Sequence, residues 1–270
     1  MLIKRIISAI VGIPLLIYIF NLGGVPFLIF NLFVVILGLN EYYQLVEAKG
    51  IEINKLIGYP IGIIWVLIIY LTNDLSLIYP LVSVGIITLL LKQILIKVDR
   101  SAILTTAVTL FGPIYISGLF SHLILLYNLE AGGENWGRFV VWLPILATWL
   151  TDMGAYFVGM NLGQHKLAPQ ISPNKTIEGA VGGLAASIII TIILGRYLLE
   201  FNYLTGVILG GTIGVVAQLG DLAASVFKRD AQIKDSGELI PGHGGMLDRL
   251  DSLLFSLPIV YYYLQWVILK

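Results

Sequence analysis

Long apolar runs separated by short polar segments set the pattern of this chain of 270 residues. A transmembrane helix needs about 20 mostly apolar residues, because the hydrocarbon core of a bilayer is about 30 Å thick. Nine runs approach that length, with cores at residues 6–20, 26–39, 56–71, 77–96, 103–127, 139–157, 177–199, 203–227 and 250–268. The pattern predicts an all-α, polytopic integral membrane helical bundle of about nine transmembrane helices.

The composition supports this placement in a membrane. Hydrophobic residues make up 58% of the chain and charged residues 12%, whereas a soluble domain carries about 25% charged residues. The formal net charge is zero, so no basic field favours nucleic acid as a partner. The chain has no cysteine, which excludes disulfides, thiolate catalysis and cysteine-ligated zinc. We therefore expect the lipid bilayer, and no nucleic acid, among the partners.

The distribution of Lys and Arg predicts how the helices are oriented. Cytoplasmic loops are enriched in these residues. If nine spans start in the cytoplasm, only Arg138, Arg196 and Lys270 of the 16 basic residues fall on the other side. We expect a cytoplasmic N-terminus, an external C-terminus and residence in the inner (cytoplasmic) membrane. The first run resembles a secretory signal but has no small-x-small cleavage site, so it is interpreted as a transmembrane helix.

A loop rich in Gly and Glu at residues 129–137 divides the chain into two parts. Residues 1–128 are plainly hydrophobic, and residues 138–270 carry the polar motifs. No internal repeat or low-complexity tract is visible. We expect a single integral membrane domain over residues 1–270, with the catalytic residues in its C-terminal part.

Four aspartates lie at the cytoplasmic ends of the predicted helices. Asp152 and Asp221 come late in the runs 139–157 and 203–227, and Asp248 and Asp251 open the last run. A carboxylate at membrane depth costs roughly 2.5–3.5 kcal/mol unless it is paired or faces water. One interpretation is a metal site, with Asp221 and Asp248 as the strongest candidate ligands and Asp152 beside them. The alternative is a set of ion pairs with nearby cations: Arg249, Lys228 or Lys175.

Spacing places several of these residues on one helical face. Asp221, Ser225 and Lys228 follow each other at i, i+4 and i+7, which is one side of a helix. Three glycines continue nearly the same stripe upstream at four-residue steps: Gly206, Gly210 and Gly214. Small residues let a neighbouring helix approach closely. That neighbour would belong either to the same chain or to a second copy in a homodimer.

The polar segment between these helices combines glycines and cations. Gly242, Gly244 and Gly245 bracket His243, and such a cluster can turn backbone N–H groups toward an anion. Four cations lie nearby, although any cytoplasmic loop is expected to be basic: Lys228, Arg229, Lys234 and Arg249. Together with the acids, they favour a phosphate site. Hard oxygen ligands combined with phosphates favour Mg²⁺ over zinc or calcium.

A second polar segment, residues 163–179, precedes the run 177–199. It brings Lys175 to the predicted helix N-terminus, with Thr176 and Glu178 in the first turn. Two interpretations stay open, a contribution to the site or ordinary helix-start chemistry. His122 and His165 have no partner visible in the sequence, and we expect them to be incidental.

The run from Ser225 to Asp251 resembles the signature of the CDP-diacylglycerol synthase (phosphatidate cytidylyltransferase) family. That signature reads Ser-x-apolar-Lys-Arg, four residues, Lys-Asp, a Gly-rich Pro-x-His-Gly-Gly, and Asp-Arg-x-Asp, and every fixed position is met. Residues 152–157 and 171–179 are also similar to segments of that family. The five N-terminal runs match only in being hydrophobic. At Met160-Asn161 the sequence departs from the family's Gly followed by a basic residue, which puts a phosphate contact of that turn in doubt.

The resemblance implies a nucleotidyltransferase of phospholipid biosynthesis that converts CTP and phosphatidate into CDP-diacylglycerol and pyrophosphate. Such in-line transfer depends on positioning and on neutralising spread-out charge. The resemblance implies Mg²⁺ on Asp221 and Asp248, Asp251 as a ligand or orienting group, and a hydrogen-bonding or proton-buffering His243. It further implies that Lys228, Arg229 and Lys234 bind the triphosphate or the leaving pyrophosphate, and that Lys175 and Arg249 bind the lipid phosphate. Four more motif residues are expected at the substrates: Ser225, Asp235, Gly244 and Gly245.

Three other functions fit parts of the pattern. A CTP-dependent polyprenol or phytol kinase shares the membrane and the nucleotide but transfers the γ-phosphoryl group. A phosphosugar transferase with a polyprenyl phosphate acceptor also needs intramembrane acids and magnesium. A cation or proton transporter would use Asp152 and Asp221 as a relay, but it has little need of the basic His-Gly-Gly loop.

Overall fold

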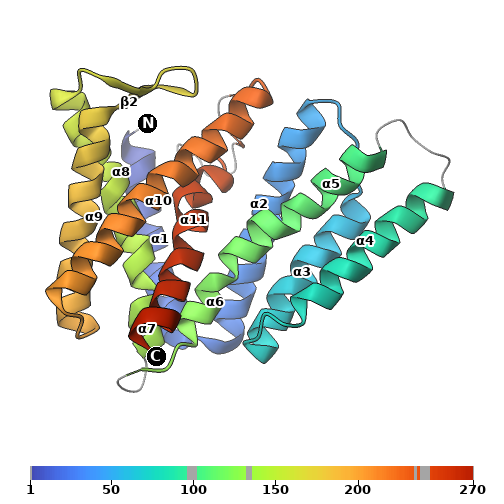
Figure 1. Ribbon diagram of the computed structural model, residues 1–270, viewed down its shortest axis with the longest axis horizontal. Coiled ribbons are helices and arrows are strands. Elements are labelled where there is room, and N and C mark those ends of the chain that lie inside the picture. The colour runs from blue at the N-terminus through green and yellow to red at the C-terminus, as the bar shows by residue number, and fades with distance from the viewer. Residues whose placement is uncertain (1, 96–101, 132–135, 234–235, 238–243, 270) are drawn as a thin grey trace. The chain divides into compact units, whose positions relative to one another are not determined.

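The structure is a computed structural model that describes residues 2–95, 102–131, 136–233, 236–237 and 244–269 (Figure 1). The chain divides into two compact units. The first unit comprises Met1–Leu125 with Asp230–Arg249, and the second comprises Leu126–Arg229 with Leu250–Lys270. The segment between the last two long helices therefore groups with the N-terminal helices. The single integral membrane domain over residues 1–270 stays a prediction.

The first unit is built from helices. They are α1 (Leu2–Leu22), α2 (Gly24–Ala48), α3 (Lys55–Thr72), α4 (Ile78–Leu95), α5 (Ala102–Pro113) and the π-helical turn η1 (Ile114–Gly118). The helix α6 (His122–Tyr127) leads from this unit into the next. Tyr43 of α2 is fully buried and donates a hydrogen bond to the carbonyl oxygen of Thr109 in α5 at 3.2 Å. Gly58 and Gly112 make room for its ring.

The second unit contains helices and one hairpin. They are α7 (Trp136–Val140), α8 (Trp142–Leu162), β1 (Lys166–Ala168), β2 (Ser172–Thr176), α9 (Ile177–Leu198), α10 (Tyr203–Asp230), α11 (Leu247–Tyr263) and η2 (Leu264–Ile268). The last residue of α10 and the first three of α11 belong to the first unit.

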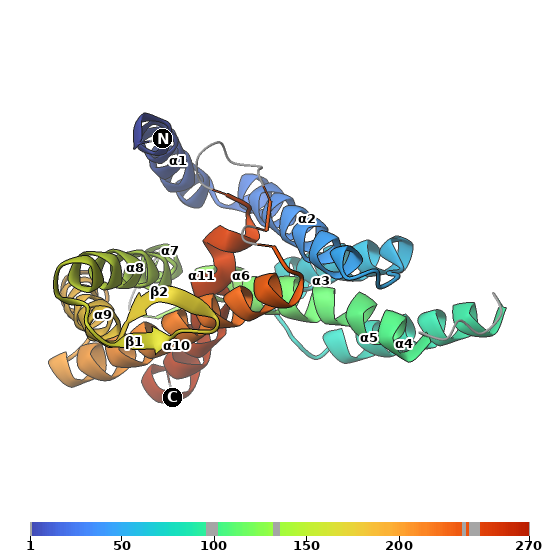
Figure 2. The same cartoon turned by 90° about the horizontal axis from the view of Figure 1, so that it is seen from above.

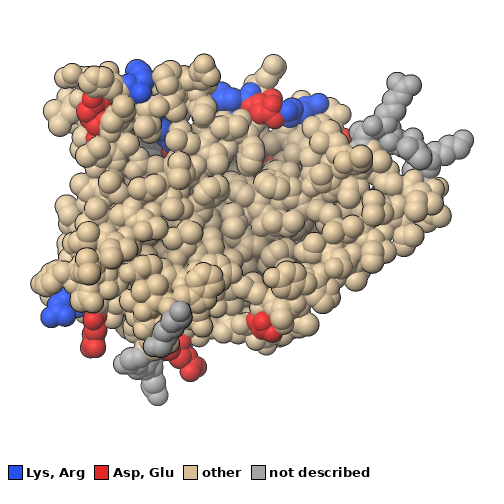
Figure 3. Space-filling model, in the orientation of Figure 1, with Lys and Arg blue, Asp and Glu red and all other residues tan. Residues whose placement is uncertain are grey.

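All nine predicted runs form helices, and the chain is a multi-pass membrane protein of helical architecture, as predicted. Within the described residues, seven helices are long and apolar enough to cross a membrane. In α1 only the apolar part Ile10–Leu22 counts toward a span, which is shorter than those seven helices, and the last run forms α11 with 17 residues followed by η2. The count of nine and the orientation therefore stay predictions. On the face shown in Figure 3, charged side chains lie at helix ends and leave an uncharged surface between them.

Close glycine packing joins α8, α9 and α10 in the second unit. A Cβ atom on Gly210 would lie 2.7 Å from the Cα atom of Ile188 in α9. At the same place the Ser187 hydroxyl donates a hydrogen bond to the carbonyl oxygen of Gly210 at 2.7 Å. Gly154 of α8 meets the backbone of Gly182 in α9 in the same way. The predicted close neighbour of the glycine stripe is thus α9 of the same chain, and a homodimer stays a prediction.

The hairpin is the main element that the sequence pattern did not predict. β1 and β2 pair antiparallel, with Lys166 opposite Thr176 and Ala168 opposite Ser172. Its strands are short, and the proline at position 173 breaks any alternating pattern. The hairpin lies at the ends of α8, α9 and α10 (Figure 2). It turns the polar segment into a fixed element instead of a loop.

Glu178 and Thr176 fix the junction of the hairpin with α9. The Thr176 hydroxyl caps the helix by accepting a hydrogen bond from the backbone N–H of Gly179 at 3.1 Å. The Glu178 carboxylate accepts the backbone N–H groups of Gln164 and His165 and lies 2.6 Å from Nδ1 of His165. Helix-start chemistry therefore explains both residues, and His165 has a partner that the sequence did not reveal.

His122 also has partners that the sequence did not reveal. Its side chain is buried, and Nδ1 lies 2.9 Å from the carbonyl oxygen of Gly118. Gly118 ends η1 and His122 begins α6, so this contact is local.

Candidate active site

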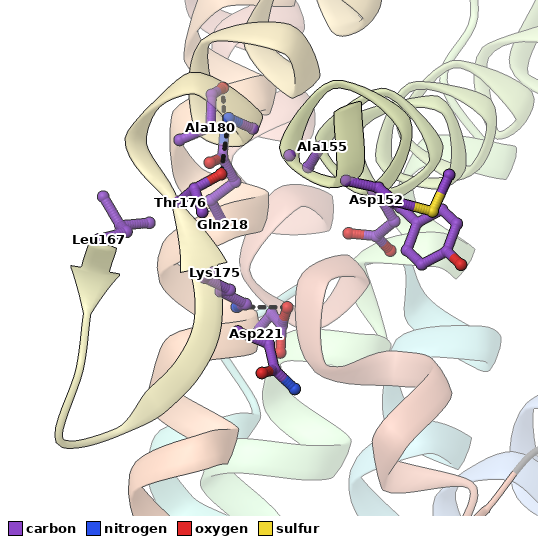
Figure 4. Close-up of a pocket in the computed structure, with 13 residues that line it drawn as sticks. Asp152, Ala155, Leu167, Lys175, Thr176, Ala180, Gln218 and Asp221 are labelled. Atoms are coloured by element: carbon purple, nitrogen blue, oxygen red, sulfur yellow. Dashed lines mark hydrogen bonds and ion pairs between the residues drawn. The ribbon is translucent and has the colours of Figure 1, made fainter. Parts of the chain in front are cut away.

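A pocket of about 450 Å³ opens in the second unit where α8, the hairpin, α9 and α10 meet (Figure 4). α8 contributes Asp152 and Tyr156, β2 contributes Lys175, and α10 contributes Gln218 and Asp221. Apolar side chains complete its wall, Met160 and Leu167 among them. The pocket thus combines charged groups with the apolar surface of membrane helices.

Lys175 and Asp221 form an ion pair in this pocket. Nζ of Lys175 lies 2.5 Å from Oδ2 of Asp221, and the two side chains are 26% and 29% exposed. The sequence left open whether Asp221 would pair with a cation or hold a metal, and the ion pair is present in this structure. Such an ion pair offsets the free-energy cost of placing a carboxylate at membrane depth. Because both partners line the pocket, each charge also faces the space that a substrate can enter.

Asp152 and Gln218 complete the polar wall. Figure 4 shows the carboxylate of Asp152 pointing from α8 toward the side on which Lys175 and Asp221 lie. The Gln218 amide nitrogen donates to the carbonyl oxygens of Ala180 at 3.1 Å and Gly214 at 2.9 Å. This amide joins α9 to α10 beside the pocket, one turn before Asp221.

Asp251 comes close to the same group of charges. A Cβ atom on Gly220 would collide with the carbonyl oxygen of Asp251, so α11 lies directly against the residue before Asp221. The Asp251 side chain is buried, and its carboxylate interacts electrostatically with Asp221, Asp152 and Lys228. Three of the four predicted aspartates and two predicted lysines, Lys175 and Lys228, therefore gather in the second unit.

The remaining predicted residues of α10 lie further along the helix. Ser225 is buried one turn beyond Asp221. Arg229 donates through Nε to the carbonyl oxygen of Ile171 in the hairpin turn at 3.1 Å. The guanidinium thus braces the hairpin that carries Lys175.

The donor set suits magnesium, although a ready cluster is not formed. Within the described ranges, no three His, Cys, Asp or Glu side chains are grouped so that they could hold a metal ion. Mg²⁺ is usually held by one or two carboxylates and completes its shell with water and substrate phosphates. Asp152, Asp221 and Asp251 offer hard oxygen atoms of this kind. The metal itself stays a prediction.

In the first unit, Asp248 braces the segment that leads into α11. Its Oδ2 atom accepts the backbone N–H groups of Ser236 at 3.0 Å and Gly245 at 3.1 Å. Gly244 has φ +79°, the left-handed region that favours glycine. A metal ion shared by Asp248 and Asp221 would join residues of different units, so this shared metal site stays a prediction.

Sequence reasoning missed Glu41. This residue lies in α2 and is only 2% exposed. Its carboxylate accepts the backbone N–H groups of Met246 and Leu247, each at 2.7 Å, and the hydroxyl of Ser236 at 2.8 Å. The available signal was an acid just after the apolar run 26–39, where a carboxylate close to membrane depth is costly unless something pairs with it.

The glycine-flanked backbone is paired with anions of the protein itself, and the phosphate site stays a prediction. In this structure the anions are the carboxylates of Glu41 and Asp248, which take the N–H groups of residues 245–247. Arg249 is exposed in the first turn of α11. Four predicted residues lie outside the described residues: Lys234, Asp235, Gly242 and His243.

Comparison with known proteins gives the family. The profile of the cytidylyltransferase family matches residues 3–267. The chain is 36% identical to the phosphatidate cytidylyltransferase of Synechocystis sp. over 96% of this chain and 95% of that protein. It is 33% identical to the Staphylococcus aureus protein of the same name, over 95% and 96% of the two chains. The Bacillus subtilis protein is 31% identical over 97% of each chain.

This chain belongs to the cytidylyltransferase family. The resemblance seen in the motifs is thereby confirmed, and it extends over the N-terminal helices, where the motifs gave no signal.

Proposed function

We propose that this chain transfers the cytidylyl group of CTP to phosphatidate and releases pyrophosphate. The main structural support for this proposal is the Lys175–Asp221 ion pair, which lines a pocket at the ends of membrane helices. The relatives named phosphatidate cytidylyltransferase, at 31–36% identity over nearly their whole length, support this substrate pair.

The proposed reaction is an in-line displacement. A phosphate oxygen of phosphatidate forms a bond to the α-phosphorus of CTP, and the bond from that phosphorus to the bridging oxygen of pyrophosphate breaks. The attacking phosphate is an anion near neutral pH, so no strong general base is required. The chain's task is to bring two anionic groups together and to neutralise the charge that builds up between them.

Charged side chains of the second unit suit this task. Lys175 would leave Asp221 to bind the lipid phosphate, and Asp221 with Asp152 would hold Mg²⁺. When bound, this ion neutralises charge on the triphosphate. Lys228 would bind the leaving pyrophosphate. A charge pair that opens in this way supplies both a cation and a carboxylate at the moment of binding.

The apolar part of the pocket suits a lipid substrate. Tyr156 and Met160 line the pocket and are 64% and 62% exposed. They lie on α8, which is part of a segment that is long and apolar enough to cross a membrane. We infer that the acyl chains remain in the bilayer next to α8 while the phosphate reaches Lys175.

The proposed setting is the inner membrane with the active site open to the cytoplasm, where CTP is present. The distribution of Lys and Arg supports this orientation, with α8 and α10 ending on the cytoplasmic side. A homodimer is an additional proposal that rests on the sequence alone.

The test is pyrophosphate release by purified protein with CTP and phosphatidate in mixed micelles, with and without Mg²⁺. We expect release that needs both substrates and stops when EDTA removes the metal. Formation of CDP in place of pyrophosphate would identify a kinase. Turnover of labelled UDP-sugars would identify a phosphosugar transferase, and ion flux in proteoliposomes without nucleotide would identify a transporter.

A further inference from the structure

We infer that Glu41 is a positioning residue for the motif loop, which we define as residues 236–237 and 244–247. The geometry assigns it the task of holding the first turn of α11, and with it Asp248, in place. The inference rests on the proposed function for its link to catalysis, but the contacts that carry it are independent of the substrates. Nothing in the family's motifs points to α2.

Glu41 supplies an N-terminal cap for α11 from another helix. The first N–H groups of a helix have no partner within it, and a negative charge at this end is favoured by the helix dipole. Oε1 of Glu41 accepts the N–H of Met246, and Oε2 accepts the N–H of Leu247, the first residue of α11. Each carboxylate oxygen thus takes one of two successive N–H groups. This bidentate contact fixes both the position and the direction of the helix start.

The burial of Glu41 makes this contact costly to lose. The side chain is only 2% exposed, and a carboxylate removed from water costs several kcal/mol unless hydrogen bonds replace its hydration. Within the described residues, the donors to Glu41 are the N–H groups of Met246 and Leu247 and the hydroxyl of Ser236, and all three belong to the motif loop. Because all of these donors belong to one loop, the buried carboxylate acts to hold that loop in place.

Two glycines of the motif loop allow this approach. A Cβ atom on Gly237 would lie 2.9 Å from Oε1 of Glu41, and one on Gly245 would collide with both Glu41 and the Ser236 hydroxyl. Neither has a φ in the left-handed region that favours glycine. These glycines are therefore explained by the carboxylate that they surround, and a role in binding substrate is not needed to account for them.

A second contact ties the same segment to α2. Lys49, directly after α2, forms an ion pair with Asp230 at the end of α10. Lys49 and Glu41 lie eight residues apart, which is about two turns along the helix. Asp230 precedes the motif loop, and Leu247 ends it, so α2 holds both ends of the segment that joins α10 to α11. A plainly hydrophobic helix of the N-terminal part therefore positions a predicted catalytic residue.

The test compares three variants of the full chain in detergent: Glu41→Gln, Ser236→Ala and Glu47→Gln. The Glu41→Gln variant keeps the side-chain size but replaces one accepting oxygen with an NH₂ group that faces a backbone N–H. Glu47 is the matched control, because it lies on the same helix, is exposed and pairs with Lys55. Two readouts are needed, steady-state pyrophosphate release and amide hydrogen exchange of a peptide containing Met246 and Leu247.

We expect Glu41→Gln to lower kcat by about thirtyfold, in the range found for residues that orient a catalytic group. The KM for CTP should change by less than about threefold, because Glu41 touches no substrate in the proposed reaction. Exchange at Met246 and Leu247 should become about tenfold faster or more. We expect Ser236→Ala to cause a smaller change in the same direction and Glu47→Gln to behave like the wild type.

Several outcomes would overturn the inference. One is a Glu41→Gln variant with kcat within twofold of the wild type, and another is a loss of kcat without faster exchange at Met246 and Leu247. If Glu41→Gln does not yield folded protein, Ser236→Ala decides, and wild-type exchange in that variant would refute the contact. A wild type that releases no pyrophosphate would refute the proposed function, while the exchange data would still test the role of Glu41.

Discussion

The two units of this protein accommodate carboxylates at membrane helices in different ways. In the second unit, Asp221 is paired with the ammonium group of Lys175, and both side chains line a pocket. In the first unit, Glu41 and Asp248 are satisfied by backbone N–H groups of the motif loop. The first arrangement joins two charges on separate elements, and the second joins charges to the backbone.

The difference indicates which carboxylates can change partners. An ion pair at a pocket can open when a cation and an anion bind together, because each partner gains a new counter-charge. A buried carboxylate with three backbone or hydroxyl donors loses all of them if it moves, and each lost donor costs about 1–3 kcal/mol. Asp221 therefore suits substrate chemistry, and Glu41 suits a fixed structural task near it.

The largest expected effect comes from removing the predicted metal ligands. Asp221→Ala and Asp248→Ala should each lower kcat for pyrophosphate release by about a thousandfold or more, because charge stabilisation in the transition state is lost. Asp74→Asn is a control, since Asp74 caps a short turn through the N–H of Ser76. An Asp248→Ala variant that loses only as much as Glu41→Gln would remove Asp248 from the metal and leave it as a brace of the loop.

The next largest effect is expected for a Lys175 variant, which tests whether Lys175 binds the substrate or only neutralises Asp221. Lys175→Gln should lower kcat/KM for phosphatidate about a hundredfold, which corresponds to losing a charge-assisted hydrogen bond of roughly 2–3 kcal/mol. Lys166→Gln is the matched control, because Lys166 is exposed on the neighbouring strand of the same hairpin. Equal kinetics of the two variants would show that the ion pair has no part in binding.

A smaller effect, on stability, is expected from disturbing the helix packing that holds Asp221. Gly210→Ala should lower the free energy of unfolding by about 1–3 kcal/mol, because the added methyl group meets the backbone of α9. Gly211→Ala is the neighbouring control, since the nearest atom to its Cβ is Cδ1 of Ile188 at 4.0 Å. Thermal unfolding in detergent measures both. A Gly210→Ala variant as stable as Gly211→Ala would mean that α9 and α10 are less tightly packed than described.

The smallest effect concerns the brace of the hairpin. Glu178→Gln should lower kcat/KM by only about two- to fivefold, because its carboxylate accepts the N–H groups of Gln164 and His165 and does not line the pocket. Glu200→Gln, an exposed acid in the loop between α9 and α10, should leave the kinetics unchanged. A loss as large as that of Lys175→Gln would place Glu178 among the residues that act on substrate.

Local pattern explains what could be predicted and what could not. Apolar length predicted the helical membrane architecture, and the four-residue spacing of Gly206, Gly210 and Gly214 predicted that a helix packs closely there without identifying that helix. Both properties are contained in one continuous segment. The hairpin was missed because strands of three and five residues, one with a proline, carry no periodic signal. The contact of Glu41 with Met246 was missed because it joins positions 205 residues apart.

The amino-acid sequence by itself determined that the chain is a helical membrane protein with a basic, glycine-rich motif, and the motif gave the family. These features depend on composition and on spacing along one helix. Only the tertiary structure decided that Lys175 meets Asp221, that Asp251 joins them, and that α2 holds the start of α11. Such pairings depend on which distant segments come together, and neither hydropathy nor periodicity encodes that choice.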